Sequence, residues 1–125
     1  MANILSILII EDDDLTAHLY QKVLEDAGFN VLTALNTDAA EQMLEGIEIN
    51  LVILDHHLPD KDGTQWLEEL HSREEYRELP VILVSAIARE TGPLRYDPYV
   101  WFMEKPRAPQ QIVTAVQSTI ERFGS

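Results

Sequence analysis

The stretch Leu51-Val52-Ile53-Leu54-Asp55 joins an unbroken apolar run to a single carboxylate. A short run of aliphatic and β-branched residues is typical of a strand that is buried on both faces, as in parallel sheets. Three other apolar runs of this chain also end at polar side chains. They are residues 7–10 before Glu11 and Asp12, residues 81–84 before Ser85, and residues 101–103 before Glu104 and Lys105.

Helical patterns separate these runs, which predicts an α/β domain built from strand–helix units. Strands are expected at about residues 4–10, 30–35, 51–54, 81–84 and 99–103. In an open parallel sheet, ligands bind beyond the carboxyl ends of the strands. The chain would therefore bring carboxylates, a hydroxyl and one ammonium group to a single edge. That combination suits the binding of a divalent cation and the handling of a phosphoryl group.

The helices are expected to pack apolar stripes against this sheet. The first would bury Leu15, Leu19, Tyr20, Val23, Leu24 and Ala27, with Asp14 as its cap and Gly28 as its stop. The second, capped by Thr37 and running to about Leu44, would bury Ala40, Met43, Leu44 and Ile47. The third opens at Thr64 or Gln65 and buries Trp66, Leu67 and Leu70. The last runs from about Pro109 to Phe123 and buries Ile112, Val116, Ile120 and Phe123.

Size and composition favour one domain over residues 1–125, because 46% of the residues are hydrophobic. The chain has no cysteine, which excludes disulfides and thiolate metal sites. No apolar run approaches the roughly 20 residues of a membrane span, and a cytoplasmic protein is expected. A net charge of −13 repels nucleic-acid phosphate, so no nucleic acid is expected to bind this domain.

One strand–helix unit breaks the pattern, because Gly92, Pro93 and Pro98 fall where its helix should run. Proline inside a helix costs about 3 kcal/mol. A shortened or irregular fourth helix is therefore expected within residues 86–98. A homodimer, if formed, would use a non-standard face, that is, one that does not rely on a regular fourth helix.

The chain resembles the receiver domain of bacterial two-component response regulators. The resemblance rests on four groups of residues at characteristic separations. They are Ile9-Ile10-Glu11-Asp12-Asp13, residues 54–63 (Leu-Asp-His-His-Leu-Pro-Asp-Lys-Asp-Gly), Val84-Ser85-Ala86 and Glu104-Lys105-Pro106. The resemblance implies a flavodoxin-like, doubly wound, five-stranded parallel sheet of order 2-1-3-4-5.

The resemblance also implies roles for individual residues. Asp55 would accept the phosphoryl group from a phosphohistidine of a sensor histidine kinase or a histidine phosphotransfer protein. Glu11, Asp12, Asp55 and the backbone carbonyl of His57 would hold Mg²⁺, with Mn²⁺ as a substitute. Such a domain catalyses only its own phosphorylation and dephosphorylation and is otherwise not an enzyme.

The remaining implied roles concern the phosphoryl group and the output. Ser85 and Lys105 would contact phosphoryl oxygens, and Phe102 would be the aromatic switch residue, coupled through Ser85. Pro106 would follow a cis peptide bond that aims Lys105 at the site. Each of these residues also has an ordinary interpretation, as a loop serine, a solubilising lysine or a packing aromatic residue.

Two other functions compete with the signalling switch. A phosphatase of the haloacid dehalogenase type would need an aspartate two residues after Asp55, and position 57 is histidine. A pseudo-receiver, which binds proteins without taking phosphate, usually lacks the aspartate or the acidic pair, and both are present here.

A metal site made by His56 and His57 is disfavoured, because adjacent residues on a strand point apart. His18 and His71 are expected at the surface.

Overall fold

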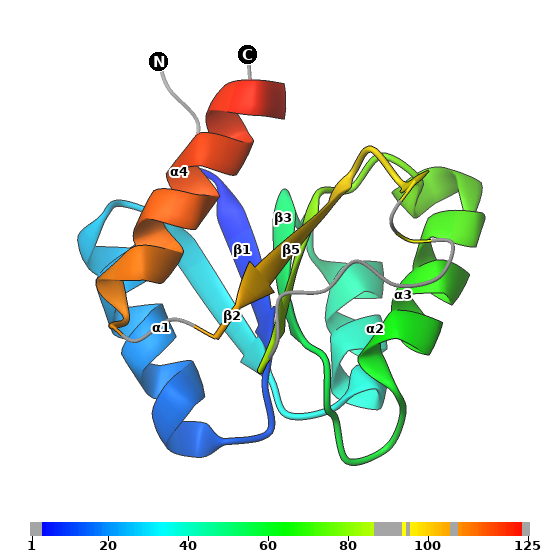
Figure 1. Ribbon diagram of the computed structural model, residues 1–125, viewed down its shortest axis with the longest axis horizontal. Helices are drawn as coiled ribbons and strands as arrows, with labels where there is room; N and C mark the ends of the chain where they lie inside the picture. The colour runs from blue at the N-terminus through cyan, green and yellow to red at the C-terminus, as the bar shows by residue number, and fades with distance from the viewer. Residues whose placement is uncertain (1–3, 87–93, 95, 106–107, 124–125) are drawn as a thin grey trace.

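The computed structural model describes residues 4–86, 94, 96–105 and 108–123. Five parallel strands form one sheet of order β2-β1-β3-β4-β5, as the resemblance implied (Figure 1). The strands are β1 (Ser6–Ile10), β2 (Asn30–Ala34), β3 (Leu51–Asp55), β4 (Val81–Ser85) and β5 (Val100–Glu104). The fifth strand begins and ends one residue later than the sequence predicted.

Helices cover both faces of the sheet (Figure 1). The helices α1 (Asp14–Asp26) and α4 (Gln110–Phe123) pack on one face, and α2 (Thr37–Gly46) and α3 (Gly63–Ser72) pack on the other. A short 3-10 helix, η1 (Glu74–Tyr76), follows α3. Every residue of β3 is buried, as its unbroken apolar run predicted. The sheet therefore separates two apolar cores.

Two helices begin one residue earlier than their expected caps would place them. The cap of α1 is Asp13, whose side chain accepts a hydrogen bond from the backbone amide of Thr16 at 3.1 Å, so the expectation for Asp14 was wrong. The cap of α2 is Asn36, which accepts from the amide of Ala39 at 2.8 Å. In both cases a short polar side chain reaches the amide three residues on, which is the ordinary geometry of a helix cap.

The buried stripe of α1 is narrower than the sequence suggested. Ala17, Tyr20 and Leu24 face the sheet, whereas Leu15 and Leu19 are 66% and 40% exposed. The helix carries two apolar stripes, and only the stripe through Tyr20 and Leu24 points at the core. Ala27 at the end of this helix and Ile47 after α2 are exposed as well. The stripe of α3 is confirmed, with Trp66, Leu67 and Leu70 buried. In α4, Ile112 and Val116 are buried as predicted and Ile120 is partly buried, while the side chain of Phe123 lies outside the described residues.

The connection between β4 and β5 is described only in part. No α-helix occurs there among residues 85–86, 94 and 96–99; Leu94 is buried and Tyr96 is exposed. The expected irregularity of residues 86–98 lies mostly outside the described residues. Trp101 and Phe102 pack into opposite cores, which confirms that they lie on opposite faces of β5.

His71 is not at the surface, contrary to expectation. Its imidazole is buried between α3 and the segment before β5, with Nδ1 2.6 Å from Asp97 Oδ2 and Nε2 2.8 Å from the carbonyl oxygen of Leu79. His18 is exposed, as expected. Within the described ranges, no helix is both long and apolar enough to cross a membrane.

Candidate functional site

The register of the sheet places Glu11 and Asp55 side by side. Ile10 of β1 pairs with Leu54 of β3, so the residues that follow them emerge together at the carboxyl edge. Because side chains alternate along a strand, Glu11 and Asp55 face the same side of the sheet as Ile9 and Ile53. That side is covered by α1 and α4. A backbone hydrogen bond from the amide of Glu11 to the carbonyl oxygen of Ala34 (3.0 Å) fixes the end of β1.

Glu11, Asp12 and Asp55 form a cluster of carboxylates. Each offers one oxygen, and these three oxygens lie within 4.8 Å of one another. Glu11 and Asp55 are only 3% and 7% exposed, while Asp12 lies at the surface. Three carboxylates at this separation repel one another unless a cation or a proton neutralises them. The donor set is all oxygen, which is the chemistry that Mg²⁺ prefers.

Glu11 is the carboxylate of this cluster with a buried and unpaired oxygen. Its Oε2 atom is buried and has no hydrogen-bond partner. Burial, followed by the hydrogen bond and the charge of Asp55, raises the pKa of Glu11 to about 8, although the charge of Lys105 opposes the shift. A buried polar atom left unpaired in this way is costly, so the site is built to receive a partner.

Lys105 and Ser85 reach the same edge from β5 and β4. The amide of Lys105 donates to the carbonyl oxygen of Ser85 at 2.7 Å, which sets the direction of the chain after β5. Glu11, Tyr20, Asp55 and Lys105 line a common void of about 10 Å³, together with apolar residues of the core. The structure thus brings the expected ammonium group into the surroundings of the carboxylates.

The loop after Asp55 is closed by backbone hydrogen bonds between its beginning and its end. The amide of His57 donates to Asp55 Oδ1 at 3.3 Å, and the amide of Gly63 donates to the carbonyl oxygen of His56 at 2.9 Å. His57 and Asp62 also pair as an isolated antiparallel bridge. The loop therefore folds back beside the end of β3 and holds one oxygen of the Asp55 carboxylate.

His56 and His57 do not point apart, contrary to expectation. Their rings stack, with centroids 4.7 Å apart and planes inclined by 13°. The expectation assumed that both residues belong to a strand, but β3 ends at Asp55. In the part of the chain that the structure describes, the only grouping of side chains suited to a metal is the carboxylate cluster.

Gly63 is required by close packing against this loop. A Cβ atom at Gly63 would lie 2.6 Å from the carbonyl oxygen of Asp55 and 2.9 Å from that of His56. Both neighbours are backbone atoms, which cannot rotate away. The glycine thus permits the start of α3 to approach the residue that follows the strand.

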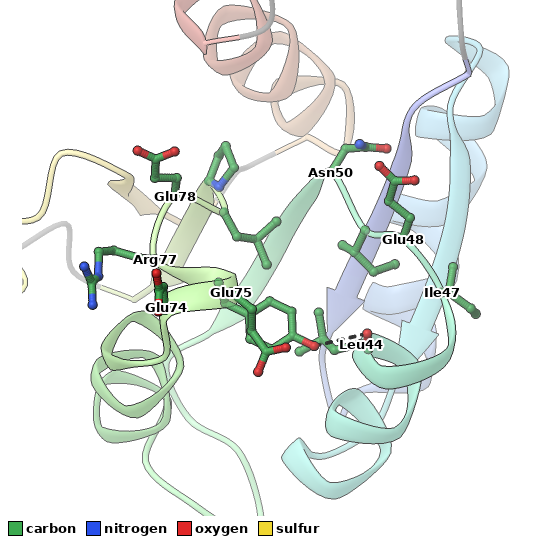
Figure 2. A pocket seen from close by; sticks show the side chains of 12 residues that line it. Leu44, Ile47, Glu48, Asn50, Glu74, Glu75, Arg77 and Glu78 are labelled. Atoms are coloured by element: carbon green, nitrogen blue, oxygen red, sulfur yellow. Dashed lines mark hydrogen bonds between the residues drawn. The ribbon is translucent and has the colours of Figure 1, made fainter.

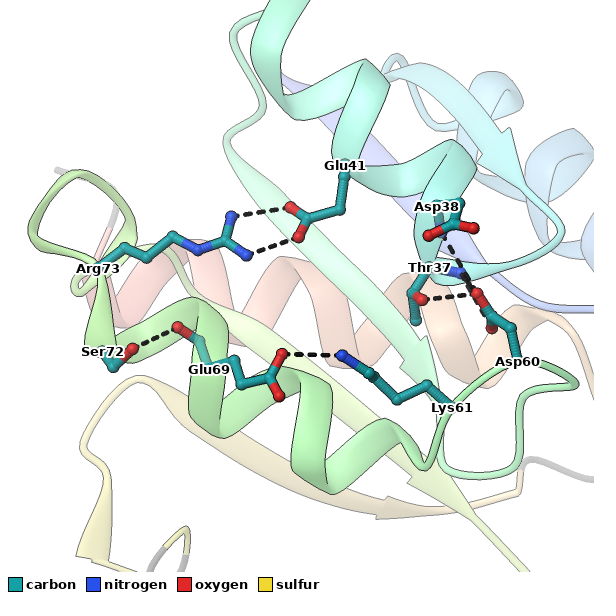
Figure 3. A network of polar contacts seen from close by, with 8 residues as sticks. All are labelled: Thr37, Asp38, Glu41, Asp60, Lys61, Glu69, Ser72 and Arg73. Carbon is teal, nitrogen blue, oxygen red and sulfur yellow. Dashed lines mark hydrogen bonds and ion pairs between the residues drawn. The ribbon is translucent and has the colours of Figure 1, made fainter.

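Polar contacts tie this loop to α2 (Figure 3). The side chain of Asp60 accepts hydrogen bonds from the amide and the hydroxyl of Thr37. Further along, the guanidinium of Arg73 donates to both carboxylate oxygens of Glu41 at 2.8 and 2.5 Å, and that contact lowers the pKa of Glu41. Asp60 therefore joins the loop to the start of α2, and Arg73 joins the end of α3 to the middle of α2.

Ser85 and Phe102 lie on the same face of neighbouring strands. Leu83 pairs with Phe102 and Ser85 pairs with Glu104, so both side chains project toward α2 and α3. Phe102 and Ser85 are half-buried. Their expected coupling stays a prediction. Pro106, and with it the expected cis peptide bond, lies outside the described residues.

Tyr20, Asp60 and Gly63 belong to the surroundings of the site, and the sequence did not assign them there. Burial, together with the charges of Glu11 and Asp55, raises the pKa of Tyr20 to about 12. The signal for Tyr20 was its place on the inner stripe of the helix that follows the acidic residues. The signals for Asp60 and Gly63 were turn residues in the loop after Asp55.

Comparisons with known proteins agree with this arrangement. The model of the response regulator receiver domain family matches residues 7–117. The transcriptional regulatory protein AruR of Pseudomonas aeruginosa is 32% identical over 135 residues, which cover 98% of this chain and 52% of AruR. The phosphate regulon transcriptional regulatory protein PhoB of Escherichia coli is 28% identical over 122 residues, which cover 94% of this chain and 52% of PhoB. The chain thus spans about half the length of these curated relatives.

Solved structures show the same fold. A sensor protein from Polaromonas sp. JS666 is similar with a TM-score of 0.84 and 26% identity, covering 94% of this chain and 97% of that one. A CheY-like response regulator receiver domain from Methanospirillum hungatei is similar with a TM-score of 0.81 and 22% identity, covering 96% of each chain. Because the family model matches most of its length, this chain belongs to the family of response regulator receiver domains.

Proposed function

We propose that this domain is a phosphoacceptor of a two-component system or phosphorelay, with Asp55 as the residue that is phosphorylated. The observation that carries the proposal is the cluster of Glu11, Asp12 and Asp55 at the edge that Lys105 also reaches. The partner that supplies the phosphoryl group is a sensor histidine kinase or a histidine phosphotransfer protein. Phosphorylation then changes a surface that a downstream partner binds.

The proposed reaction is the transfer of a phosphoryl group from a histidine nitrogen to a carboxylate oxygen. The amide of His57 holds Asp55 Oδ1, which leaves Oδ2 to attack phosphorus. The new bond joins this oxygen to phosphorus, while the bond between nitrogen and phosphorus breaks and its electron pair returns to the imidazole of the donor. The carboxylate needs no general base, and the product is an acyl phosphate.

A divalent cation fits the proposed chemistry. Glu11, Asp12, Asp55 and the carbonyl oxygen of His57 would hold Mg²⁺, and Mn²⁺ would substitute. Bound there, the cation would neutralise the carboxylates and the charge on the transferred group. The buried, unpaired Oε2 of Glu11 supports this assignment, because a cation or its water would satisfy it.

Two further residues have proposed contacts with the phosphoryl oxygens. Lys105, which lines the same void as Glu11 and Asp55, supplies a compact positive charge, and Ser85 supplies a hydroxyl donor. Ser85 shares its face of the sheet with Phe102, so a movement of Ser85 toward the phosphoryl group opens room into which Phe102 turns. We propose this movement as the link between the site and the output surface.

Intact-mass spectrometry tests the proposal directly. The protein is incubated with acetyl phosphate and MgCl₂, beside an Asp55→Asn variant and a sample without Mg²⁺. A single phosphoryl adduct is expected on the wild-type protein alone. A folded protein that gains no adduct would contradict the proposal and favour the pseudo-receiver, and continuous turnover of a phosphoester would favour the phosphatase.

A further inference from the structure

A groove lies at the edge of the sheet opposite the carboxylate cluster (Figure 2). It has a volume of about 660 Å³ and is lined by residues 44, 47–50 and 74–80. Asn50 directly precedes β3 and Pro80 directly precedes β4, so the groove sits at the amino ends of these strands. A strand of five residues is about 16 Å long. The groove is therefore remote from Asp55 and separate from the proposed phosphorylation site.

The walls of the groove are held in place by hydrogen bonds. The hydroxyl of Tyr76 donates to the carbonyl oxygen of Leu44 at 3.2 Å and so joins one wall to the other (Figure 2). Asn50 exchanges two hydrogen bonds with Ser6, both at 2.8 Å. The carbonyl oxygen of Pro80 accepts from the amide of Val52 at 3.0 Å. Because both walls are anchored to the sheet or to each other, a ligand would meet a preformed surface, which lowers the entropy cost of binding.

The groove offers apolar surface between negative charges. Ile47 is 40% exposed, and Ile49 and Tyr76 are half-buried. Glu48 stands on one wall, and Glu74 and Glu75 stand on the other (Figure 2). These three glutamates are exposed, and none of their carboxylates makes a hydrogen bond or salt bridge within the described part of the chain.

Positive charge is scarce at the same place. Among the lining residues, Arg77 is the single cationic side chain, against four glutamates. Unpaired carboxylates on both sides of an apolar strip complement a ligand that alternates cationic and apolar groups.

We propose that this groove docks an extended cationic and amphipathic segment of a partner protein, with its apolar side chains against Ile47 and Tyr76 and its Lys or Arg side chains beside the glutamates. Nucleic acids and anionic membranes are repelled by the same carboxylates. A second copy of this chain would set one acidic rim against another. The proposal goes beyond the phosphoacceptor function and does not depend on it.

A titration followed by nuclear magnetic resonance tests the proposal. The probe is a synthetic peptide of three Lys-Leu repeats, acetylated and amidated at its ends, added to ¹⁵N-labelled full chain at low salt. The backbone resonances of residues 47–49 and 74–78 are expected to shift, and added salt should weaken the binding. A peptide with Ser in place of each Leu should bind about tenfold more weakly, because it retains the charge and lacks the apolar contacts.

Charge-reversal variants distinguish the groove from general attraction to an acidic protein. The double variant Glu74→Lys, Glu75→Lys should weaken binding of the Lys-Leu peptide about tenfold. The double variant Asp26→Lys, Glu121→Lys makes the same change of net charge on α1 and α4, which cover the other face of the sheet, and should weaken it less than about threefold. Ile47→Ser, at an exposed position, should also weaken it while leaving the fold intact.

Three outcomes would overturn the proposal. The first is no saturable shift at the groove with peptide at about millimolar concentration, the weak end of specific affinities. The second is equal weakening by the two double variants. The third is a concentration-dependent shift of the groove resonances without peptide, which would assign the face to self-association.

Discussion

The carboxylate of Asp60 accepts hydrogen bonds from both the backbone amide and the hydroxyl of Thr37, at 3.1 and 2.7 Å. Thr37 is the first residue of α2, and Asp60 lies in the loop that follows Asp55. A weaker contact, 3.4 Å, reaches the amide of Asp38. The loop thus supplies part of the cap of a neighbouring helix, whose first amides have no partner within the helix.

Replacing Asp60 with Ala should lower the free energy of unfolding by about 1 kcal/mol, as expected for the loss of a capping carboxylate. Urea unfolding at neutral pH, followed by the fluorescence of buried Trp66, measures the difference. The matched control is Asp26→Ala, at the carboxyl end of α1, where a negative charge is unfavourable and its loss should be neutral or slightly stabilising. Equal destabilisation by both variants would contradict the capping role.

The contribution of Asp60 should depend on pH in a definite direction. Burial alone would raise the pKa of Asp60, but the hydrogen bonds from Thr37 and Asp38 lower it below the ordinary value of 3.8. A carboxylate with a lowered pKa stabilises the folded state above its unfolded pKa and loses that effect as pH falls through the folded value. The difference between wild type and Asp60→Ala should therefore be constant near neutral pH and shrink below about 3.8. A difference that grows on acidification would contradict this assignment.

Local patterns in the sequence predicted the strands and the carboxylates at one edge, whereas the order of the strands was implied by the resemblance to receiver domains. Five short apolar runs define the strands, and parallel pairing alone then brings their polar ends to one edge. The contact of Asp60 with Thr37 could not be predicted, because it joins residues 23 apart through a loop whose path depends on the packed fold. The exposure of Leu15 could not be predicted either. The helix α1 carries two apolar stripes, and the sequence pattern does not say which of them packs against the sheet.

Replacing Gly63 with Ala should disturb the loop next to Asp55. The added Cβ would meet the carbonyl oxygens of Asp55 and His56 at 2.6 and 2.9 Å. We expect a loss of about 1–3 kcal/mol in the free energy of unfolding, the usual cost of overpacking, together with slower phosphorylation by acetyl phosphate. The matched control is Gly46→Ala at the end of α2, where a Cβ meets nothing within 4 Å. If Gly46→Ala were as damaging as Gly63→Ala, close packing would not explain the role of the glycine.

Replacing Asp55 with Asn should stabilise the metal-free protein and abolish its response to Mg²⁺. Carboxylate oxygens of Glu11 and Asp55 lie within 4.8 Å of each other, so their negative charges repel when both groups are ionised. Removing one charge should raise the unfolding free energy by about 0.5–2 kcal/mol in the presence of EDTA, a gain of the size seen when strained functional sites are relaxed.

Added Mg²⁺ should then stabilise the wild type by about 2.7 kcal/mol at a concentration 100 times its Kd. The same concentration should leave Asp55→Asn nearly unchanged. Thermal unfolding at a series of MgCl₂ concentrations measures both effects. The control is Asp14→Asn, which removes an exposed acid outside the cluster and should keep the wild-type response. A response that survives in Asp55→Asn would place the metal elsewhere.

His71 should be required for stability, although its sequence context suggested a surface residue. Because its ring nitrogens lie 2.6 and 2.8 Å from Asp97 and the carbonyl oxygen of Leu79, His71→Ala leaves two acceptors unpaired and opens a cavity. A loss of about 2–4 kcal/mol is expected. Exposed His18→Ala, the control, should change stability by less than about 0.5 kcal/mol.

The effect of His71→Ala should be concentrated at the start of β5. Asp97 also accepts from the amide of Tyr99 at 2.9 Å, so releasing its carboxylate loosens the turn that leads into the strand. Hydrogen exchange should therefore accelerate at Tyr99 and Val100 more than at the amides of β1. His71→Gln, which can restore one of the two contacts, should fall between the wild type and the alanine variant. Uniform acceleration across the sheet would instead mean that His71 supports the core as a whole and does not specifically anchor β5.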